Sequence, residues 1–408
     1  LGHSPKNVIG SDVVVVSGAI GSANPEVLEA GSLHIPVISR GDILCEMMRN
    51  SMGVAVAGTH GKTTTSGLIT NIFRAAGCDP SFVIGGILNE TKRNARYGGG
   101  RYFIVEADES DGTFLKLHPV IAVLTNIDHD HLSNYGNNFA ALVDSFREYI
   151  EKVPFFGAIV LCIDDDVARS LVSGLQRPVI TYGFDPGAVY RAENAVIGEN
   201  KSQFVVQRPF PHSRLLINLS ITGTHNVRNA LAAIAVATEE GLGDSDILEG
   251  LENFRGITRR FEVKKLVVNK KSLTLVDDYG HHPSEMTCSI DTVRQIWPER
   301  RLIMVFQPHR YTRTRDLLSE FATVLSKTDV LILCEVYAAG ETPIEAASSE
   351  VLAALIRKND KTETFLVPGP IEAVQVAKSI VRDGDVLVVQ GAGDVSSVSA
   401  GFEENNYG

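Results

Sequence analysis

The sequence has few cysteines and no long hydrophobic run. Its five cysteines are far apart, odd in number and never spaced as C-x-x-C, which argues against a disulfide framework and against a cysteine-based structural zinc site. No apolar run approaches the roughly 18 residues of a membrane span, and no signal-peptide pattern is present. We therefore expect a cytoplasmic protein with reduced thiols and no membrane partner.

An excess of positive charge is also missing. The formal net charge is −11, from 49 acidic residues against 38 lysines and arginines. This balance argues against a nucleic-acid partner, which would normally require a basic patch, but it is compatible with a bound nucleotide. A length of 408 residues with 44% hydrophobic residues predicts two or three domains, each with its own core.

A glycine-rich turn between an apolar strand and a helix is the clearest motif, Val54-Ala-Val-Ala-Gly-Thr-His-Gly-Lys-Thr-Thr-Thr65. Gly58 and Gly61 allow successive N–H groups to form a concavity for phosphate. Lys62 adds a charge for the outer phosphates, and the Thr63 hydroxyl is a candidate Mg²⁺ ligand. The turn is two residues shorter than the common P-loop pattern, yet the strand before it and the helix after it predict nucleotide-phosphate binding.

Acidic residues and histidines follow two further apolar strands, in Ile104-Val-Glu-Ala-Asp-Glu-Ser-Asp-Gly-Thr113 and Thr125-Asn-Ile-Asp-His-Asp-His131. Carboxylates at strand ends are typical Mg²⁺ ligands in nucleotide sites. The histidines could instead suggest zinc, but no third histidine lies nearby. The pattern favours a magnesium–phosphate site.

Strand and helix signals alternate along most of the chain, which predicts α/β domains with largely parallel sheets. Residues 178–222 differ, since their short alternating strands predict a small antiparallel insert. Residues 253–260 read as a linker to a second α/β unit. The glycine turn at 391–394 is interpreted as a strand-to-helix turn rather than a dinucleotide site.

The first residues read as the middle of an α/β unit, with strands at Val13–Ser17 and Ile35–Ser39 and helices at Pro25–Ala30 and Ile43–Arg49. We therefore expect the start of an N-terminal domain to lie upstream. A processed N-terminus is the alternative.

Two asparagines stand at the start of an apolar helix expected at 226–240, within Gly223-Thr-His-Asn-Val-Arg-Asn229. The side-chain amide of Asn226 or Asn229 can both donate to and accept from an adenine edge. Helix capping by Thr224 or Asn226 is the alternative interpretation.

Two polar loops each follow a strand of the last α/β unit, Asp277-Asp-Tyr-Gly-His-His-Pro283 and Gln307-Pro-His-Arg-Tyr-Thr-Arg313. Both should lie at the carboxyl edge of one sheet, where α/β folds bind ligands. Arg310 and Arg313, with His309, could form a clamp for a carboxylate or phosphate. A solvated basic loop is the simpler interpretation.

Taken together, these motifs resemble the Mur ligase family, and the resemblance extends over nearly the whole chain. The matching segments are Gly58–Thr65, Glu106–Leu115, Asn126–Tyr135, Gly223–Ala233, Arg259–Glu262, Asp277–Glu285, Phe306–Thr314, Val336–Ile344 and Gly391–Asp394. The resemblance implies an N-terminal Rossmann-like UDP-sugar domain, partly present as residues 1–50, a central ATPase domain at 51–257 and a C-terminal Rossmann-like domain at 258–408. It also implies a monomer or weak homodimer.

The resemblance further implies an ATP-dependent reaction that joins L-alanine to the carboxylate of UDP-N-acetylmuramate through an acyl phosphate. Its implied catalytic residues are Lys62, Glu109, His131, His281, Arg310 and Arg313. The implied metal ligands, for Mg²⁺, are Thr63, Glu109 and His131. The implied ATP contacts are Gly58, Thr59, His60, Gly61, Lys62, Thr63, Thr64, Asn226, Asn229, Arg260 and Asp278. The implied substrate contacts are His3, Ser17, Tyr279, His281, His309, Arg310 and Arg313.

Two features depart from the family pattern. The family's first glycine-rich loop, which grips the UDP pyrophosphate, would lie before residue 1. The lysine that several related ligases carry in carbamylated form has no counterpart in 139–150. Other functions therefore stay open: a ligase that adds a ready-made tripeptide to the same sugar, a simple P-loop phosphotransferase, or an ATP-binding form without activity.

Overall fold

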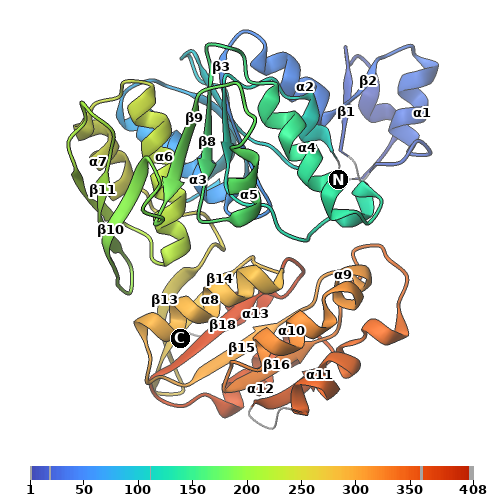
Figure 1. Ribbon diagram of the computed structural model, residues 1–408. Helices are drawn as coiled ribbons and strands as arrows, with labels where there is room; N and C mark the ends of the chain where they lie inside the picture. The colour runs from blue at the N-terminus through green and yellow to red at the C-terminus, as the bar shows by residue number, and fades with distance from the viewer. Residues whose placement is uncertain (1, 18–19, 111, 359–361, 404–408) are drawn as a thin grey trace.

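The computed structural model describes residues 2–17, 20–110, 112–358 and 362–403. Three sheets organise the chain: a two-stranded N-terminal sheet, a ten-stranded central sheet and a six-stranded C-terminal sheet. Figure 1 shows the C-terminal domain lying below the other two bodies and joined to them through a narrow connection.

The N-terminal body is small. It contains η1 (Pro5–Val8), α1 (Pro25–Ser32) and the parallel pair β1 (Val14–Val16) and β2 (Val37–Ser39). The helix expected at 43–49 instead begins at Arg40, as α2 (Arg40–Met48). Its start is fixed by a capping box, in which Ser39 Oγ accepts from the backbone N–H of Asp42 and the Asp42 carboxylate accepts from that of Ser39.

The central sheet has the strand order β12-β11-β10-β9-β8-β7-β3-β6-β4-β5. Its strands are β3 (Met52–Ala57), β4 (Ser81–Leu88), β5 (Arg93–Arg96), β6 (Tyr102–Glu106), β7 (Ile121–Leu124), β8 (Ala158–Cys162), β9 (Val179–Gly183), β10 (Tyr190–Ile197), β11 (Ser202–Gln207) and β12 (Leu215–Leu219). The antiparallel segment expected at 178–222 is present, since β10, β11 and β12 pair antiparallel. It is continuous with the main sheet, because β9 pairs parallel with both β8 and β10.

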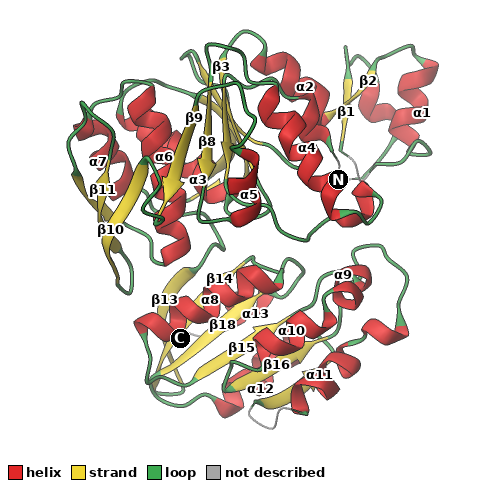
Figure 2. Ribbon diagram, in the orientation of Figure 1, coloured by secondary structure: helices red, strands yellow, loops and turns green. Residues whose placement is uncertain are grey.

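Helices cover both faces of the central sheet (Figure 2). One face packs against α3 (Lys62–Ala75), α6 (Thr224–Glu239) and α7 (Asp244–Glu252), and the other against α2, α4 (Phe139–Glu151) and α5 (Asp166–Leu171). Short 3-10 turns, η2 (Thr113–Lys116) and η3 (Leu132–Tyr135), follow the acidic and histidine motifs. Because β3 lies between β6 and β7, the loops that follow these three strands meet at one edge of the sheet.

The C-terminal sheet has the order β13-β14-β18-β15-β16-β17. Its strands are β13 (Glu262–Val268), β14 (Lys271–Asp278), β15 (Leu302–Phe306), β16 (Val330–Cys334), β17 (Glu363–Val367) and β18 (Asp385–Gln390). All neighbours pair parallel except β13 and β14. The turn at 391–394 leads from β18 to α13 (Ser396–Glu403), as expected.

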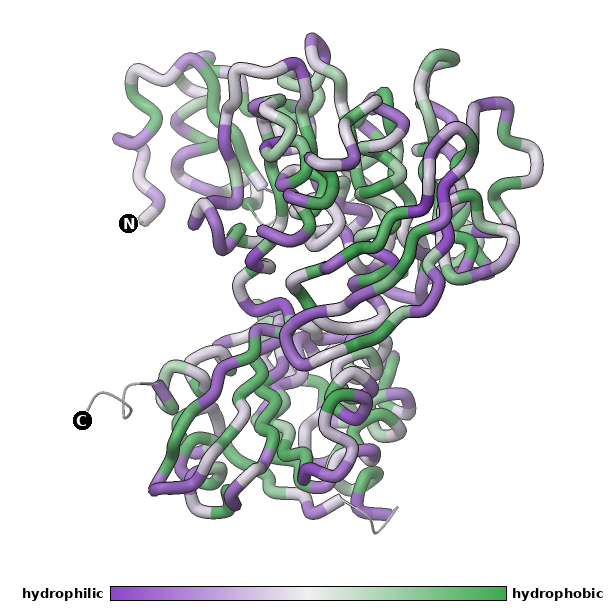
Figure 3. Tube along the Cα trace, turned by 90° about the vertical axis from the view of Figure 1, so that its left-hand side faces the viewer, coloured by the Kyte–Doolittle hydropathy of each residue, from purple (hydrophilic) through white to green (hydrophobic). Residues whose placement is uncertain are grey.

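Helices also cover both faces of this sheet. They are α8 (Pro283–Ile296), α9 (Tyr311–Asp316), α10 (Leu318–Leu325), η4 (Glu345–Ala347), α11 (Ser349–Arg357), α12 (Pro370–Ile380) and α13. In Figure 3 the strands of this domain are largely green, the colour of apolar residues. Within the described residues, no helix is both long and apolar enough to cross a membrane.

The helices α3 and α7 pack closely at Gly250. A Cβ atom on Gly250 of α7 would lie 2.5 Å from the Cα atom of Ile72 in α3, so Gly250→Ala must push two helix backbones apart. We expect a loss of about 1–3 kcal/mol in unfolding free energy, measured as a lower melting temperature. Gly31→Ala in α1 is the matched control, because nothing lies within 4 Å of its added Cβ. It should be neutral or stabilising, and equal effects of the two substitutions would contradict this packing.

Candidate active site between the central and C-terminal domains

The glycine turn between β3 and α3 has the backbone that the sequence predicts. Gly58 has φ +128° and Gly61 has φ +82°, both in the region that favours glycine. A Cβ on Gly58 would lie 2.1 Å from Thr125 Oγ1, and one on Gly61 would lie 2.6 Å from Asn229 Oδ1. The turn therefore needs glycine at both positions for conformation and for space.

The loop after β7 holds this turn in place. Thr125 Oγ1 donates to the carbonyl oxygen of His60 at 2.6 Å, and Asn126 Nδ2 donates to the same oxygen at 3.0 Å. In return, the N–H of His60 donates to Asn126 Oδ1 at 2.9 Å. The Thr59 hydroxyl accepts from the N–H of Asp128. The two strand-end motifs thus form one hydrogen-bonded unit.

Lys62 and Glu109 form a buried ion pair beside the turn. Lys62 Nζ lies 2.8 Å from Glu109 Oε2 and also donates to the carbonyls of Gly58 and Thr59. Burial raises the pKa of Glu109 to about 7, although Lys62 opposes the shift. Burial disfavours the Lys62 charge too, but Glu109, Glu106 and Asp108 outweigh this and raise the Lys62 pKa. The charged Lys62 ammonium group therefore lies beside the glycine turn.

Two of the three predicted metal ligands adjoin this lysine. Thr63 follows it in α3 and is buried, and Glu109 pairs with it. Burial lowers the pKa of His131, with Arg313 and Lys62 adding to the effect. A carboxylate, a hydroxyl and a neutral imidazole near a phosphate turn are a donor set that can hold Mg²⁺. Asp111, the fourth carboxylate of the acidic motif, lies outside the described residues.

A cavity of about 190 Å³ opens beside the glycine turn, between the central domain and α8 of the C-terminal domain. Most of the residues predicted to contact ATP line this cavity. They are His60, Gly61, Thr64, Asn226, Asn229, Arg260 and Asp278. The structure thus brings together side chains from four separate segments of the sequence.

Asn226 and Asn229 link α6 to the glycine turn. Asn226 Nδ2 donates to the Thr222 carbonyl at 2.7 Å, and Asn229 Nδ2 donates to Asn226 Oδ1 at 3.1 Å. Asn229 Oδ1 accepts from Thr65 of α3 at 3.2 Å. The capping alternative is wrong, because the N-cap of α6 is Gly223, which makes no side-chain cap bond.

Asp278 and Arg260 border the cavity from the C-terminal domain and the linker. The two Asp278 oxygens accept from the N–H of Gly280 at 2.6 Å and from Ser289 Oγ at 3.0 Å. Arg260 contacts Glu285 at 3.4 Å and lies over the ring of Tyr279. Glu285, which had no predicted role, also accepts from the backbone N–H groups of two histidines at the start of α8.

His281 and His309 bring the two polar loops of the C-terminal sheet together. Their ring centroids are 5.6 Å apart, and His309 also stacks on Tyr337. Burial lowers the pKa of His281 to about 3 and that of His309 to about 4. Both imidazoles are therefore neutral near pH 7.

The two arginines expected to act as a clamp lie in different surroundings. Arg310 has φ +72° and an exposed side chain. Arg313 is almost buried and forms an ion pair with Asp130 of the central domain at 3.2 Å. A protein carboxylate thus engages Arg313, while Arg310 faces solvent.

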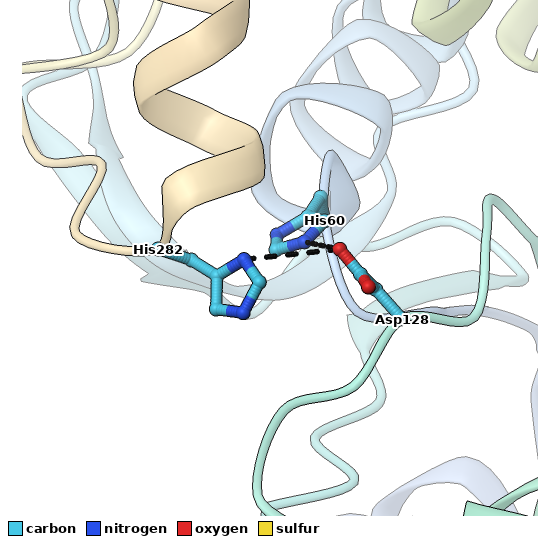
Figure 4. A group of neighbouring side chains, drawn as sticks. All are labelled: His60, Asp128 and His282. Carbon is cyan, nitrogen blue, oxygen red and sulfur yellow. Dashed lines mark hydrogen bonds and ion pairs between the residues drawn. The ribbon is translucent and has the colours of Figure 1, made fainter. Parts of the chain in front are cut away.

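A second cluster that sequence reasoning missed joins the two domains (Figure 4). His60 Nε2 lies 3.1 Å from Asp128 Oδ2, and His282 Nδ1 lies 3.7 Å from the same oxygen. Ser284 Oγ also donates to this oxygen. The donor atoms of the three residues lie close enough together to hold a metal ion. However, the interactions of His60 with the carboxylates of Asp128 and Glu285 outweigh burial and raise the pKa of His60 to about 9, so a protonated His60 lies at this contact between the domains.

His3 and Ser17 lie in the N-terminal body. His3 Nδ1 is 2.8 Å from Glu26 of α1, and the Ser17 carbonyl accepts from the N–H of Ile20. The cavity lining includes neither residue. Figure 1 shows this body beside the central domain, above the C-terminal one.

Comparison with known proteins identifies the class. Residues 56–237 match the Mur ligase middle domain, and residues 259–393 match the Mur ligase glutamate ligase domain. A protein of Legionella pneumophila strain Philadelphia 1, named UDP-N-acetylmuramate–L-alanine ligase, is 47% identical over 99% of this chain and 86% of its own length. The chain belongs to the Mur ligase family.

Solved structures agree with this assignment. UDP-N-acetylmuramate–alanine ligase MurC of Thermotoga maritima superposes with a TM-score of 0.82 and 26% identity, over 99% of this chain and 87% of that one. The MurF ligase of Thermotoga maritima in complex with ADP shares the fold, with a TM-score of 0.74 and 18% identity, over 100% of this chain and 97% of that one.

The His60 contact predicts a pH dependence. The folded pKa of about 9 lies above the ordinary value of 6.5, so the protonated imidazole stabilises the fold most fully below pH 6.5. That stabilisation should be lost as pH rises from 6.5 through 9, by at most about 3 kcal/mol. Melting curves of the wild type and His60→Gln should differ most at pH 6 and converge toward pH 10. A difference that does not change with pH would contradict the assigned protonation state.

Proposed function

We propose that this chain is an ATP-dependent ligase that joins L-alanine to the carboxylate of UDP-N-acetylmuramate and releases ADP and phosphate. One observation carries the proposal: the glycine turn contacts one polar loop of the C-terminal domain, where the ring centroids of His60 and His282 are 5.0 Å apart, and that loop meets the other at His281 and His309. A phosphate-binding turn alone would serve many reactions. Loops for two further substrates beside it fit a ligase. The name of the 47% identical relative adds support.

The chemistry proceeds in two steps. The muramate carboxylate attacks the γ-phosphorus of ATP, so that an acyl phosphate forms and ADP leaves. The amine of alanine then attacks the acyl carbon, phosphate leaves and an amide remains. Lys62 balances charge on the transferred phosphoryl group. Asn226, Asn229, Arg260 and Asp278 would bind the nucleoside, because all four line the cavity.

We assign Mg²⁺ to Thr63, Glu109 and His131. When bound, Mg²⁺ neutralises negative charge on the phosphates. In this structure both Glu109 oxygens contact Lys62 Nζ, at 3.0 and 2.8 Å. Binding of a phosphate group would give the lysine a second anionic partner, which leaves the carboxylate available to a cation.

The amino-acid side of the site is assigned to the C-terminal loops. Tyr279, His281, His309, Arg310 and Arg313 would contact the muramate carboxylate and the incoming alanine. Neutral histidines suit this task, because they can donate or accept hydrogen bonds without adding charge beside the arginines. His3 and Ser17 are proposed on the uridine side. The five free cysteines fit a reducing cytoplasm as the compartment.

The test distinguishes the alanine ligase from the tripeptide ligase and from a phosphotransferase. The chain is incubated with ATP, MgCl₂ and UDP-N-acetylmuramate, together with either L-alanine or the tripeptide L-Ala-γ-D-Glu-meso-diaminopimelate. We expect ADP release and an amide product, identified by mass spectrometry, with alanine only. Product from the tripeptide alone would assign the recycling reaction, and ADP release without any amide would exclude both ligases.

Loss of the buried lysine should abolish turnover without unfolding the chain. Lys62→Ala removes the charge beside the transferred phosphoryl group, so we expect the amide-forming rate to fall by about 100-fold or more. ADP release under saturating substrates measures the effect, and a melting curve checks the fold.

Lys116→Ala is the matched control for this substitution. Lys116 also forms an ion pair with a carboxylate, Asp42 at 2.7 Å, but the two side chains are 46% and 42% exposed and lie outside the cavity lining. Its turnover should stay close to that of the wild type. Near-normal turnover of Lys62→Ala with an unchanged melting curve would contradict the assigned role.

A further inference from the structure

The ion pair between Asp130 and Arg313 crosses from the central to the C-terminal domain. Arg313 Nε lies 3.4 Å from Asp130 Oδ1, and Arg313 Nη2 lies 3.2 Å from Oδ1 and 3.5 Å from Oδ2. The two side chains are only 8% and 10% exposed. Solvent therefore screens this pair far less than an exposed one.

The same carboxylate also contacts the proposed metal ligand. Asp130 Oδ2 lies 3.5 Å from His131 Nε2, and Asp130 Oδ1 accepts from the backbone N–H of His131 at 2.8 Å. Burial acts against the Asp130 charge, but the Arg313 guanidinium outweighs it and holds the Asp130 pKa well below its ordinary value. The ionised Asp130 carboxylate thus contacts both His131, which we assign to Mg²⁺, and Arg313, which we assign to a substrate carboxylate.

This contact also fixes the plane of the Arg313 guanidinium. Nε and Nη2 of Arg313 donate to the Asp130 carboxylate. Its third nitrogen, Nη1, lies 3.5 Å from His309 Nδ1 and 3.4 Å from the His309 carbonyl oxygen. A guanidinium has five N–H donors in a rigid plane. With one edge held by Asp130 and Nη1 beside His309, the guanidinium keeps a single orientation.

We infer that Asp130 is a positioning residue of the ligase reaction: it orients Arg313 for a substrate carboxylate and ties the C-terminal domain to the central domain beside His131. The inference rests on the proposed function. Because the pair lies between the domains, it stabilises one arrangement of the two rather than the core of either. Arg208 and Asp244 provide the contrast, since their ion pair at 2.8 Å lies wholly within the central domain.

The kinetic test compares Asp130→Asn, Asp130→Glu and the control Asp244→Asn in the full chain. Asn keeps the shape of the side chain but removes its charge. We expect Asp130→Asn to lower kcat/KM for alanine by about tenfold or more, while KM for ATP changes by less than about twofold. Asp130→Glu should recover part of the loss because it keeps the charge. Asp244→Asn should retain wild-type kinetics.

A double variant separates positioning from a general loss of stability. If Asp130 acts through Arg313, Asp130→Asn combined with Arg313→Gln should be no slower than the slower single variant. Additive losses would overturn the inference. So would wild-type kcat/KM for alanine in Asp130→Asn.

A measurement without turnover keeps this inference distinct from the proposed function. Trypsin should cut the linker at the exposed Arg255 several-fold faster in Asp130→Asn than in the wild type or Asp244→Asn, because the domains separate more often. An unchanged rate of cleavage would contradict the inference that Asp130 holds the two domains together. If the wild type forms no amide, the proposed function fails, and the cleavage rates still decide whether Asp130 links the domains.

Discussion

The carbonyl oxygen of His60 is the point on which the site depends. Thr125 and Asn126 both donate to it, and so fix the glycine turn after β3 to the loop after β7. This contact exists because β3 and β7 are parallel neighbours whose carboxyl ends coincide. The same two loops carry Lys62 and the histidine motif. A change in the pairing of these strands would therefore move Lys62 relative to the histidine motif.

Local patterns were sufficient to predict most of the elements and the grouping of the site residues. The glycine turn, the acidic and histidine motifs and the polar loops of the last sheet all follow apolar strands, and strand ends in a parallel sheet share one edge. The strands β8 and β15 have the bounds that their apolar runs suggest. The strands β4 and β13 have a weaker sequence signal, because glycines and lysines interrupt their apolar pattern.

Contacts between domains could not be predicted from the sequence. Asp130 and Arg313 are separated by 183 positions, and their contact depends on how the linker sets one domain against the other. The Asp128 contacts with His282 and Ser284 arise in the same way. Most of these residues lie inside motifs predicted to bind ligands, but nothing in the motifs indicates that they contact one another. Ion pairs across a domain boundary can be predicted only when the relative positions of the two domains are known.

The position of β18 has a consequence for synthesis of the chain. This strand is the last of the C-terminal sheet to leave the ribosome, yet it lies between β14 and β15 at the centre of the sheet. The nascent domain therefore cannot complete its sheet until Asp385–Gln390 has emerged, while the central domain is already able to fold. Until then β14 and β15 each have an open edge that can pair with another chain. Chaperone demand should accordingly be concentrated in the final stage of translation.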